Sequence, residues 1–212
     1  MTSLPKPYDL VRRAKALAAL DLILSPDWEY RHYSFNSVWS SSEQMASMRD
    51  GCGDEWWIIF SACGWAALKG LAHESQAWSK GGRALSMAIQ KSFPAELYEF
   101  INEPAFCWPT TSFGYFYLPA NGSWLRANDF TPFSLIEAGD EYLLRHLTGS
   151  PSDYVLFADE YYETSVPLSL VKDVFCGKPI TNEIVSGLNP EITLDDIAKE
   201  LSSEIGYQCV TV

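Results

Sequence analysis

The residues best suited to chemistry lie at the two ends of a predicted β-hairpin. Asp54 and Glu55 precede its first apolar run, residues 56–60, whereas His73 and Glu74 follow its second. If the two runs pair antiparallel, these four side chains come close together. Two carboxylates beside an imidazole could bind a divalent metal or transfer protons. We call Asp54, Glu55, His73 and Glu74 the hairpin cluster.

The hairpin cluster also suits a purely structural role, because acidic side chains cap turns and a histidine forms structural hydrogen bonds. Metal sites usually have more ligands than this segment offers, so we expect neither a metal nor another cofactor. A catalytic cysteine would need Cys52 or Cys63 beside a histidine, and the spacing identifies no third group. A hydrolase or metal-dependent enzyme that uses the hairpin cluster is therefore the alternative function, and catalysis stays an open question.

A second polar cluster lies late in the chain and combines carboxylates with tyrosines. Its members are Asp159, Glu160, Tyr161, Tyr162 and Glu163. On a helix, Asp159 and Glu163 would lie one turn apart on one face and repel each other. Tyrosine provides a large contact area at a low entropic cost. We predict that this segment binds a partner, although a solvated helix with half-buried tyrosines is the structural alternative.

The overall charge restricts the classes of partner. The 15 basic and 27 acidic residues give a net charge of −12, and most of the excess falls after Phe106. Nucleic acids and anionic membranes are poor partners for such a chain, whereas a basic protein is a suitable one. The sequence does not indicate an oligomeric state.

Cysteine usage and hydropathy predict a cytoplasmic protein. The cysteines are odd in number and scattered, which favours free and mostly buried thiols in a reducing compartment. No apolar run approaches the length of about 18 residues that a membrane span needs. The cysteines are Cys52, Cys63, Cys107, Cys176 and Cys209.

Strands are expected mainly in the first part of the chain. Residues 28–39 alternate in side-chain character and are rich in aromatics, which favours a strand. Two hairpins follow, over residues 54–72 and 110–127. The predicted fold is α+β, with a mostly antiparallel sheet of two hairpins and an N-terminal strand, packed by helices.

Helices are expected on both sides of these strands. The apolar period and the capping signals predict helices at 8–24, 40–50, from Pro94 to about 101, 141–147, 154–162 and 193–205. The last third is thus helical, and Lys80–Gly81–Gly82–Arg83 is expected to form a basic loop. The 212 residues suit one domain, 1–212, in which 136–212 could form a helical subdomain.

Two segments resemble known bacterial families. The Gly51–Trp56 segment, Gly-Cys-Gly-Asp-Glu-Trp, followed by Lys69-Gly70 and by His73-Glu74-Ser75, resembles an uncharacterised bacterial family with this pattern. An acidic residue often precedes the histidine in that pattern, whereas Ala72 stands here. The resemblance implies a bacterial protein but no activity.

Residues 93–101 are similar to the Leu-Pro-x-x-Leu-x-x-Phe-Leu helix of SUKH-type immunity proteins. Those proteins are compact, acidic and α+β, and they neutralise toxins in bacteria. Together with the charge, the resemblance implies a non-enzymatic, acidic binding protein of the bacterial cytoplasm, such as an immunity protein.

Overall fold

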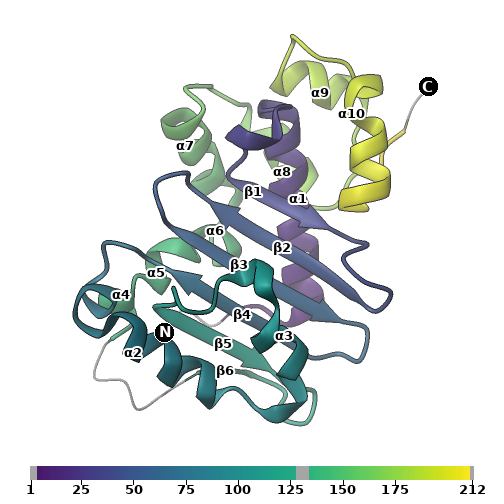
Figure 1. Cartoon of the computed structure of the whole chain (residues 1–212). Helices are drawn as coiled ribbons and strands as arrows, with labels where there is room; N and C mark the ends of the chain where they lie inside the picture. The colour runs from purple at the N-terminus through teal and green to yellow at the C-terminus, as the bar shows by residue number, and fades with distance from the viewer. Residues whose placement is uncertain (1–3, 128–133, 211–212) are drawn as a thin grey trace.

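An antiparallel sheet of six strands forms the centre of the molecule (Figure 1). The computed structural model describes residues 4–127 and 134–210. The strands are β1 (Tyr33–Asn36), β2 (Glu43–Arg49), β3 (Glu55–Ser61), β4 (Ala66–Leu71), β5 (Phe113–Tyr117) and β6 (Trp124–Arg126). They lie side by side in chain order, and helices pack around them. The α+β class and both predicted hairpins are confirmed.

Strand β2 corrects the predicted helix at 40–50. Glutamine, methionine, alanine and arginine favour a helix locally, but this segment pairs with β1 on one side and β3 on the other. Pairing on both sides of the strand overrides the weak local preference. Gly51, expected to end a helix, instead adopts a positive φ in the turn to β3.

The N-terminal strand is shorter than the predicted span of 28–39. Trp28–Tyr30 forms a short 3₁₀ turn, η1, and only Tyr33–Asn36 pairs with β2. The Asn36 side chain accepts a hydrogen bond from the backbone N–H of Val38, which begins the turn into β2. Local hydrogen bonds therefore shorten the strand at its C-terminal end.

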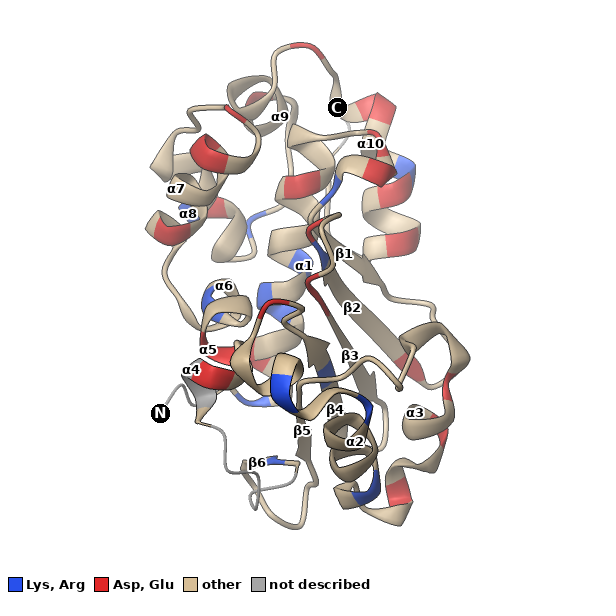
Figure 2. Ribbon diagram, turned by 60° about the vertical axis from the view of Figure 1, so that its left-hand side comes forward, with Lys and Arg blue, Asp and Glu red and all other residues tan. Residues whose placement is uncertain are grey.

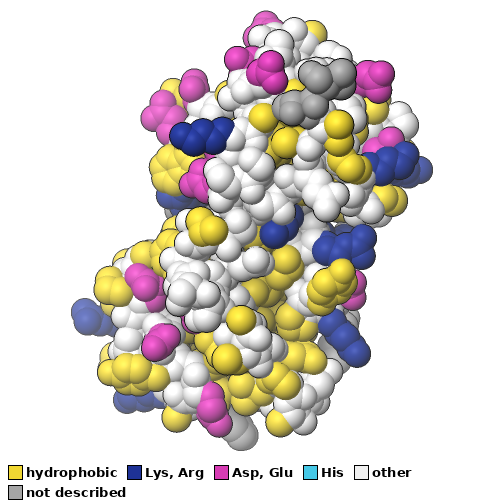
Figure 3. All heavy atoms as spheres, turned by 90° about the vertical axis from the view of Figure 1, so that its right-hand side faces the viewer, with side chains coloured by type: hydrophobic (Ala, Val, Ile, Leu, Met, Phe, Trp, Pro, Cys, Tyr) yellow, Lys and Arg dark blue, Asp and Glu magenta, His cyan; other side chains and the backbone are white. Residues whose placement is uncertain are grey.

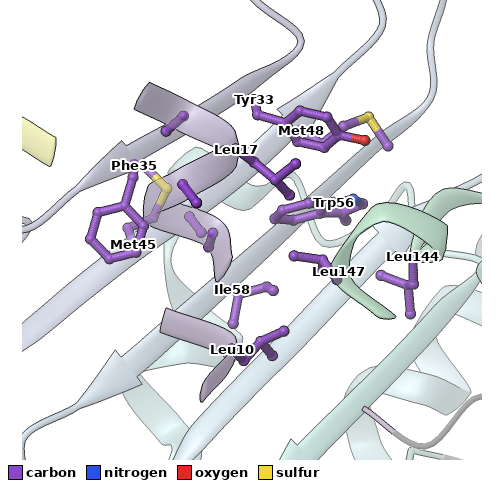
Figure 4. Packing of buried hydrophobic residues seen from close by; sticks show 14 of the residues in the cluster. Leu10, Leu17, Tyr33, Phe35, Met45, Met48, Trp56, Ile58, Leu144 and Leu147 are labelled. Atoms are coloured by element: carbon purple, nitrogen blue, oxygen red, sulfur yellow. The ribbon is translucent and has the colours of Figure 1, made fainter. Parts of the chain in front are cut away.

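Helix α1 (Pro7–Leu24) packs on one face of the sheet, behind the strands in Figure 1. Figure 4 shows Leu10 and Leu17 of α1 directed towards Trp56 and Ile58 of β3. The short helices α4 (Leu135–Ala138), α5 (Asp140–Leu143) and α6 (Arg145–Thr148) follow the second hairpin. The indole of Trp56 donates a hydrogen bond of 3.1 Å to the carbonyl of Leu143, which ties α5 to this face.

The opposite face carries α2 (Gln76–Ser92), η2 (Ala95–Leu97), α3 (Tyr98–Asn102) and η3 (Pro104–Phe106), in front of the lower strands in Figure 1. The predicted basic loop at 80–83 lies inside α2, where Gly82 has φ 47° and interrupts the helix. Hydrophobic side chains gather over the lower half of the molecule in Figure 3. The upper strands of this face lack such a helix in Figure 1.

The C-terminal helices lie beyond β1 and pack on α1 and on one another. They are α7 (Pro151–Tyr161), α8 (Leu168–Phe175), α9 (Asn182–Leu188), α10 (Leu194–Glu200) and the π-helical turn η4 (Leu201–Ile205). The predicted capping box at Thr193 and Asp196 is present, whereas α8 and α9 were not predicted. No helix in the described ranges is long and apolar enough to cross a membrane.

A fully buried carboxylate, Asp21, joins α1, β1 and α7. It accepts hydrogen bonds from the backbone N–H groups of His32 and Tyr33, at 3.1 and 2.6 Å. It also accepts hydrogen bonds from the hydroxyls of Tyr154 and Tyr162, both at 2.7 Å. Burial raises the pKa of Asp21 to about 6, although these donors stabilise its charged form.

We predict that Asp21→Ala lowers the free energy of unfolding by about 3–5 kcal/mol, because it removes the acceptor of four hydrogen bonds and leaves the Tyr33 N–H and the Tyr154 and Tyr162 hydroxyls without an acceptor. Urea unfolding followed by circular dichroism measures the change. Asp9→Ala, at an exposed position of α1, is the matched control and should lie within about 0.5 kcal/mol of the parent. A loss for Asp21→Ala no larger than the control's would contradict this role for Asp21.

Two buried histidines lie beside this network. His32 packs against Tyr33 and Phe157, and the Tyr33 hydroxyl hydrogen-bonds Nδ1 of His146. Burial lowers the pKa of His32 to about 3 and that of His146 to about 4. Both imidazoles are therefore neutral in the folded protein at neutral pH.

We predict that stability decreases as the pH falls from about 6.5 towards 4, because the unfolded chain protonates both histidines in this range and the folded chain does not. Asp21 acts in the opposite direction, since its raised pKa favours the folded state at low pH and this contribution is lost as the pH rises through about 6. Burial also raises the pKa of Asp140, which acts in the same direction as Asp21. We expect the histidines to dominate, because the pKa values of both fall by more than the pKa of Asp21 rises.

His32→Phe should reduce the loss of stability at low pH, because it removes one of the two buried histidines. Phenylalanine fits this position, since Nδ1 of His32 has no hydrogen-bond partner among the described residues and the ring packs among aromatics. The midpoints of urea unfolding at about pH 7.5 and about pH 5 measure this loss of stability. His73→Gln, which removes a more exposed histidine, should not reduce the decrease. Equal decreases for His32→Phe and the parent would show that His32 does not titrate in this way.

Candidate functional site

Three members of the hairpin cluster meet where β3 begins and β4 ends. One Asp54 carboxylate oxygen accepts hydrogen bonds from both the backbone N–H and Nδ1 of His73, each at 2.8 Å. The hydrogen bond to Asp54 raises the pKa of His73. Glu74 is a weaker neighbour, because its carboxylate lies 3.9 Å from Nε2 of His73 and its side chain is 89% exposed.

The turn from β2 to β3 builds this arrangement. One oxygen of Asp50 accepts the backbone N–H groups of Cys52, Gly53 and Asp54, at 2.8 to 2.9 Å. Gly53 has φ 125°, and a Cβ atom there would lie 3.1 Å from Cγ of the His73 ring. A side chain at position 53 would therefore press on the imidazole ring, and the positive φ makes any residue other than glycine strained there.

Glu55 corrects the prediction that all four residues of the hairpin cluster come together. It follows Asp54 at the start of β3, and its carboxylate accepts a 2.9 Å hydrogen bond from the ammonium group of Lys69. Lys69 is fully buried and also donates to the carbonyls of Phe106 and Thr110, which holds the segment after α3 on the sheet. Glu55 thus stabilises the fold through Lys69 and does not orient the His73 imidazole.

The remaining chemistry of the cluster is that of one oriented imidazole. No group of three histidine, cysteine or carboxylate side chains in the described ranges could hold a metal ion. Cys52 lines the same shallow hollow as Asp54, His73 and Tyr142, but no described hydrogen bond joins it to His73. The Asp54–His73 pair could transfer a proton, but no serine, threonine or cysteine side chain of the described residues forms a hydrogen bond with it.

The cysteines differ from the expected buried thiols. All five lie within the described ranges and are free, but four are exposed and Cys209 is half-buried. Turns explain this exposure. Cys52 lies in the bend between β2 and β3, Cys63 lies in the β3–β4 turn, Cys107 has φ 44° after η3, and Cys176 ends α8.

The second polar cluster, residues 159–163, is divided between the surface and the core. Asp159 and Glu160 are exposed on α7, whereas Tyr162 directs its hydroxyl inward to Asp21. The predicted helical pairing of Asp159 with Glu163 is wrong, because α7 ends at Tyr161 and Glu163 has φ 52°. Tyr161 is 38% exposed and stacks on Phe157.

The β2–β3 turn, which leads into the hairpin cluster, adjoins the second polar cluster at Tyr161. Asp50 and Cys52 lie close enough to contribute to the raised pKa of Tyr161, of which burial is the main cause. The β2–β3 turn also lies next to α7 in Figure 1. We call the following residues the acidic edge: Asp50, Asp54, Glu74, Asp159, Glu160 and Glu163. Figure 2 shows further acidic residues along the C-terminal helices.

Sequence reasoning missed the buried groups that support this edge. Asp21 reads as an interruption of an apolar helix, and no local pattern marks His32 or His146 as neighbours. A carboxylate within an otherwise apolar helical stretch was the one available signal, because such a group must find donors when buried.

Comparisons with family models, curated proteins and solved structures found no match to this chain.

We predict that Asp54→Asn lowers the pKa of His73 towards its ordinary value, because the amide cannot stabilise the imidazolium as the carboxylate does. An NMR titration of the imidazole Cε1–H proton measures the pKa. Glu74→Gln removes the same charge at a longer distance and should cause a smaller change. Equal changes in the two variants would contradict a specific Asp54–His73 pair.

Proposed function

We propose that this chain is a non-enzymatic binding protein that uses the acidic edge to cover a basic protein partner, as a toxin-neutralising immunity protein does. The observation that supports this function best is the proximity of a half-buried carboxylate of one segment, Asp50, to Tyr161, whose sequence neighbours Glu160 and Glu163 are exposed carboxylates. The first segment is the β2–β3 turn, and the other is the end of α7. The Asp54–His73 pair alone gives less support to an enzyme.

The carboxylates at the end of α7 are free to meet an incoming cation. Neither Asp159 nor Glu160 forms an ion pair with any described residue. Residues 151–210 contain eleven acidic and three basic side chains, so the surrounding field is negative. Such a field accelerates the encounter with a basic protein and makes the association rate fall with salt.

Exposed apolar and aromatic side chains supplement these charges. Tyr142 and Leu156 are exposed, at 63% and 64% of their surface, and Tyr161 is 38% exposed. The guanidinium of Arg145 lies 3.8 Å from the centre of the Tyr142 ring and donates to the Tyr142 carbonyl. Tyrosines held in this way give a partner contact area without a large loss of side-chain entropy.

We predict that Asp159→Lys/Glu160→Lys weakens association with the basic partner by at least tenfold, or about 1.4 kcal/mol, while the fold is retained. The product of the reading frame adjacent in the source genome is the partner to test, because immunity proteins are normally encoded beside their toxins. Growth rescue on co-expression and the association rate at two salt concentrations are the measurements.

Glu183→Lys/Glu191→Lys is the matched control, because it changes the net charge equally at two exposed positions around α9. This control should retain rescue. Equal losses in both variants would indicate a general charge effect. Full rescue by Asp159→Lys/Glu160→Lys would place the interface elsewhere, and an adjacent product that is harmless and does not bind would contradict the immunity function.

A further inference from the structure

A groove of about 380 Å³ lies on the upper strands of the sheet and shares no lining residue with the acidic edge. Its floor comes from β1, β2 and β3, on the face that α2 and α3 cover lower down. Trp28 of η1, Ala105 of η3 and Ile205 of η4 contribute walls from three separate segments. This volume is within the range of about 300–1,000 Å³ that small-molecule sites occupy.

The planar guanidinium of Arg49 stacks on tryptophan rings of the groove. Its guanidinium carbon lies 4.3 Å from the centre of the Trp28 ring and 5.7 Å from that of Trp57. No described residue accepts a hydrogen bond from the Arg49 side chain. A guanidinium stacked on aromatic rings leaves its N–H rim available, and this rim matches a carboxylate or a phosphate.

The other charged groups near Arg49 already have partners. Arg31 is paired with Glu200, and Glu55, opposite Arg49 in the strand register, is bound by Lys69. Glu204 is the exception, since it forms no ion pair with a described residue and lies at the exposed rim. Arg49 is therefore the uncommitted cation of the groove.

The floor also offers a buried hydroxyl. Ser47 is only 2% exposed and lines the groove, but its side chain forms no hydrogen bond with any described residue. Ser34 lies opposite Ser47 in the register, so both hydroxyls are on the same face of the sheet. A hydroxyl that lines the groove and has no partner among the described residues is suited to a polar group of a ligand.

We propose that this groove binds a small planar organic anion, with its carboxylate or phosphate on Arg49 and its ring among the tryptophans. Trp39 and Trp57 also line the groove and supply aromatic surface for a planar ring. Ser34 and Ser47 hydrogen-bond polar atoms of the ring. This site is independent of the partner surface at the acidic edge.

Calorimetric titration of the full chain tests the proposal with two anions, adenosine monophosphate and indole-3-acetate. Adenosine and indole-3-acetamide are the matched neutral compounds. We expect at least one anion to bind at millimolar concentration or below, and about tenfold more tightly than its neutral counterpart. The anion that binds distinguishes a nucleotide from an aromatic carboxylate.

Arg49→Met should reduce the affinity for that anion to the level of the neutral compound, whereas Arg83→Met, on the exposed surface of α2, should leave it unchanged. Thermal unfolding verifies that both variants fold. Arg49→Lys provides a second test, because it keeps the charge but lacks the planar rim and should also weaken binding. The proposal is wrong if neither anion binds, or if the folded Arg49 variants bind as the parent does.

Discussion

The packing of α1, β1 and α7 depends on one buried carboxylate, Asp21, which must receive hydrogen bonds from the protein. Asp21 lies in the otherwise apolar C-terminal half of α1, and four donors from β1 and α7 or from the residues next to them surround it. Because an unpaired charge inside a protein is very costly, the helix, the edge strand and the C-terminal layer can pack only in the arrangement that supplies those donors. The same contacts set the position of Tyr162, and hence the exposed segment beside it.

Lys69 has a corresponding role on the opposite face of the sheet. Its ammonium group binds one carboxylate and two carbonyls, and so holds the segment after α3 against the strands. Asp21 and Lys69 thus each fix a distant segment on their own face of the sheet. The two surfaces for which we propose ligands lie next to these fixed segments, the acidic edge beside α7 and the groove beside η3.

Local signals predicted what local interactions determine. The α1 helix, the β3–β4 hairpin and the Thr193 cap follow from apolar periodicity and capping residues, whereas β2 was mistaken for a helix because its pairing partners decide its conformation. The Asp54–His73 pair followed from the hairpin register. Glu55 was misplaced because neighbouring residues of a strand point to opposite faces. The groove combines strands with three distant segments, which no spacing in the sequence reveals.

The strand order has a consequence for how the chain acquires its structure. Each strand pairs only with its neighbours in sequence, so the sheet can grow hairpin by hairpin as the polypeptide leaves the ribosome. The hydroxyls that complete the shell of Asp21, however, are 133 and 141 residues further along the chain. In a nascent chain that ends before α7, the Asp21 carboxylate therefore lacks these two donors and remains hydrated. Asp21 can be fully buried only after the last third of the chain has been synthesised.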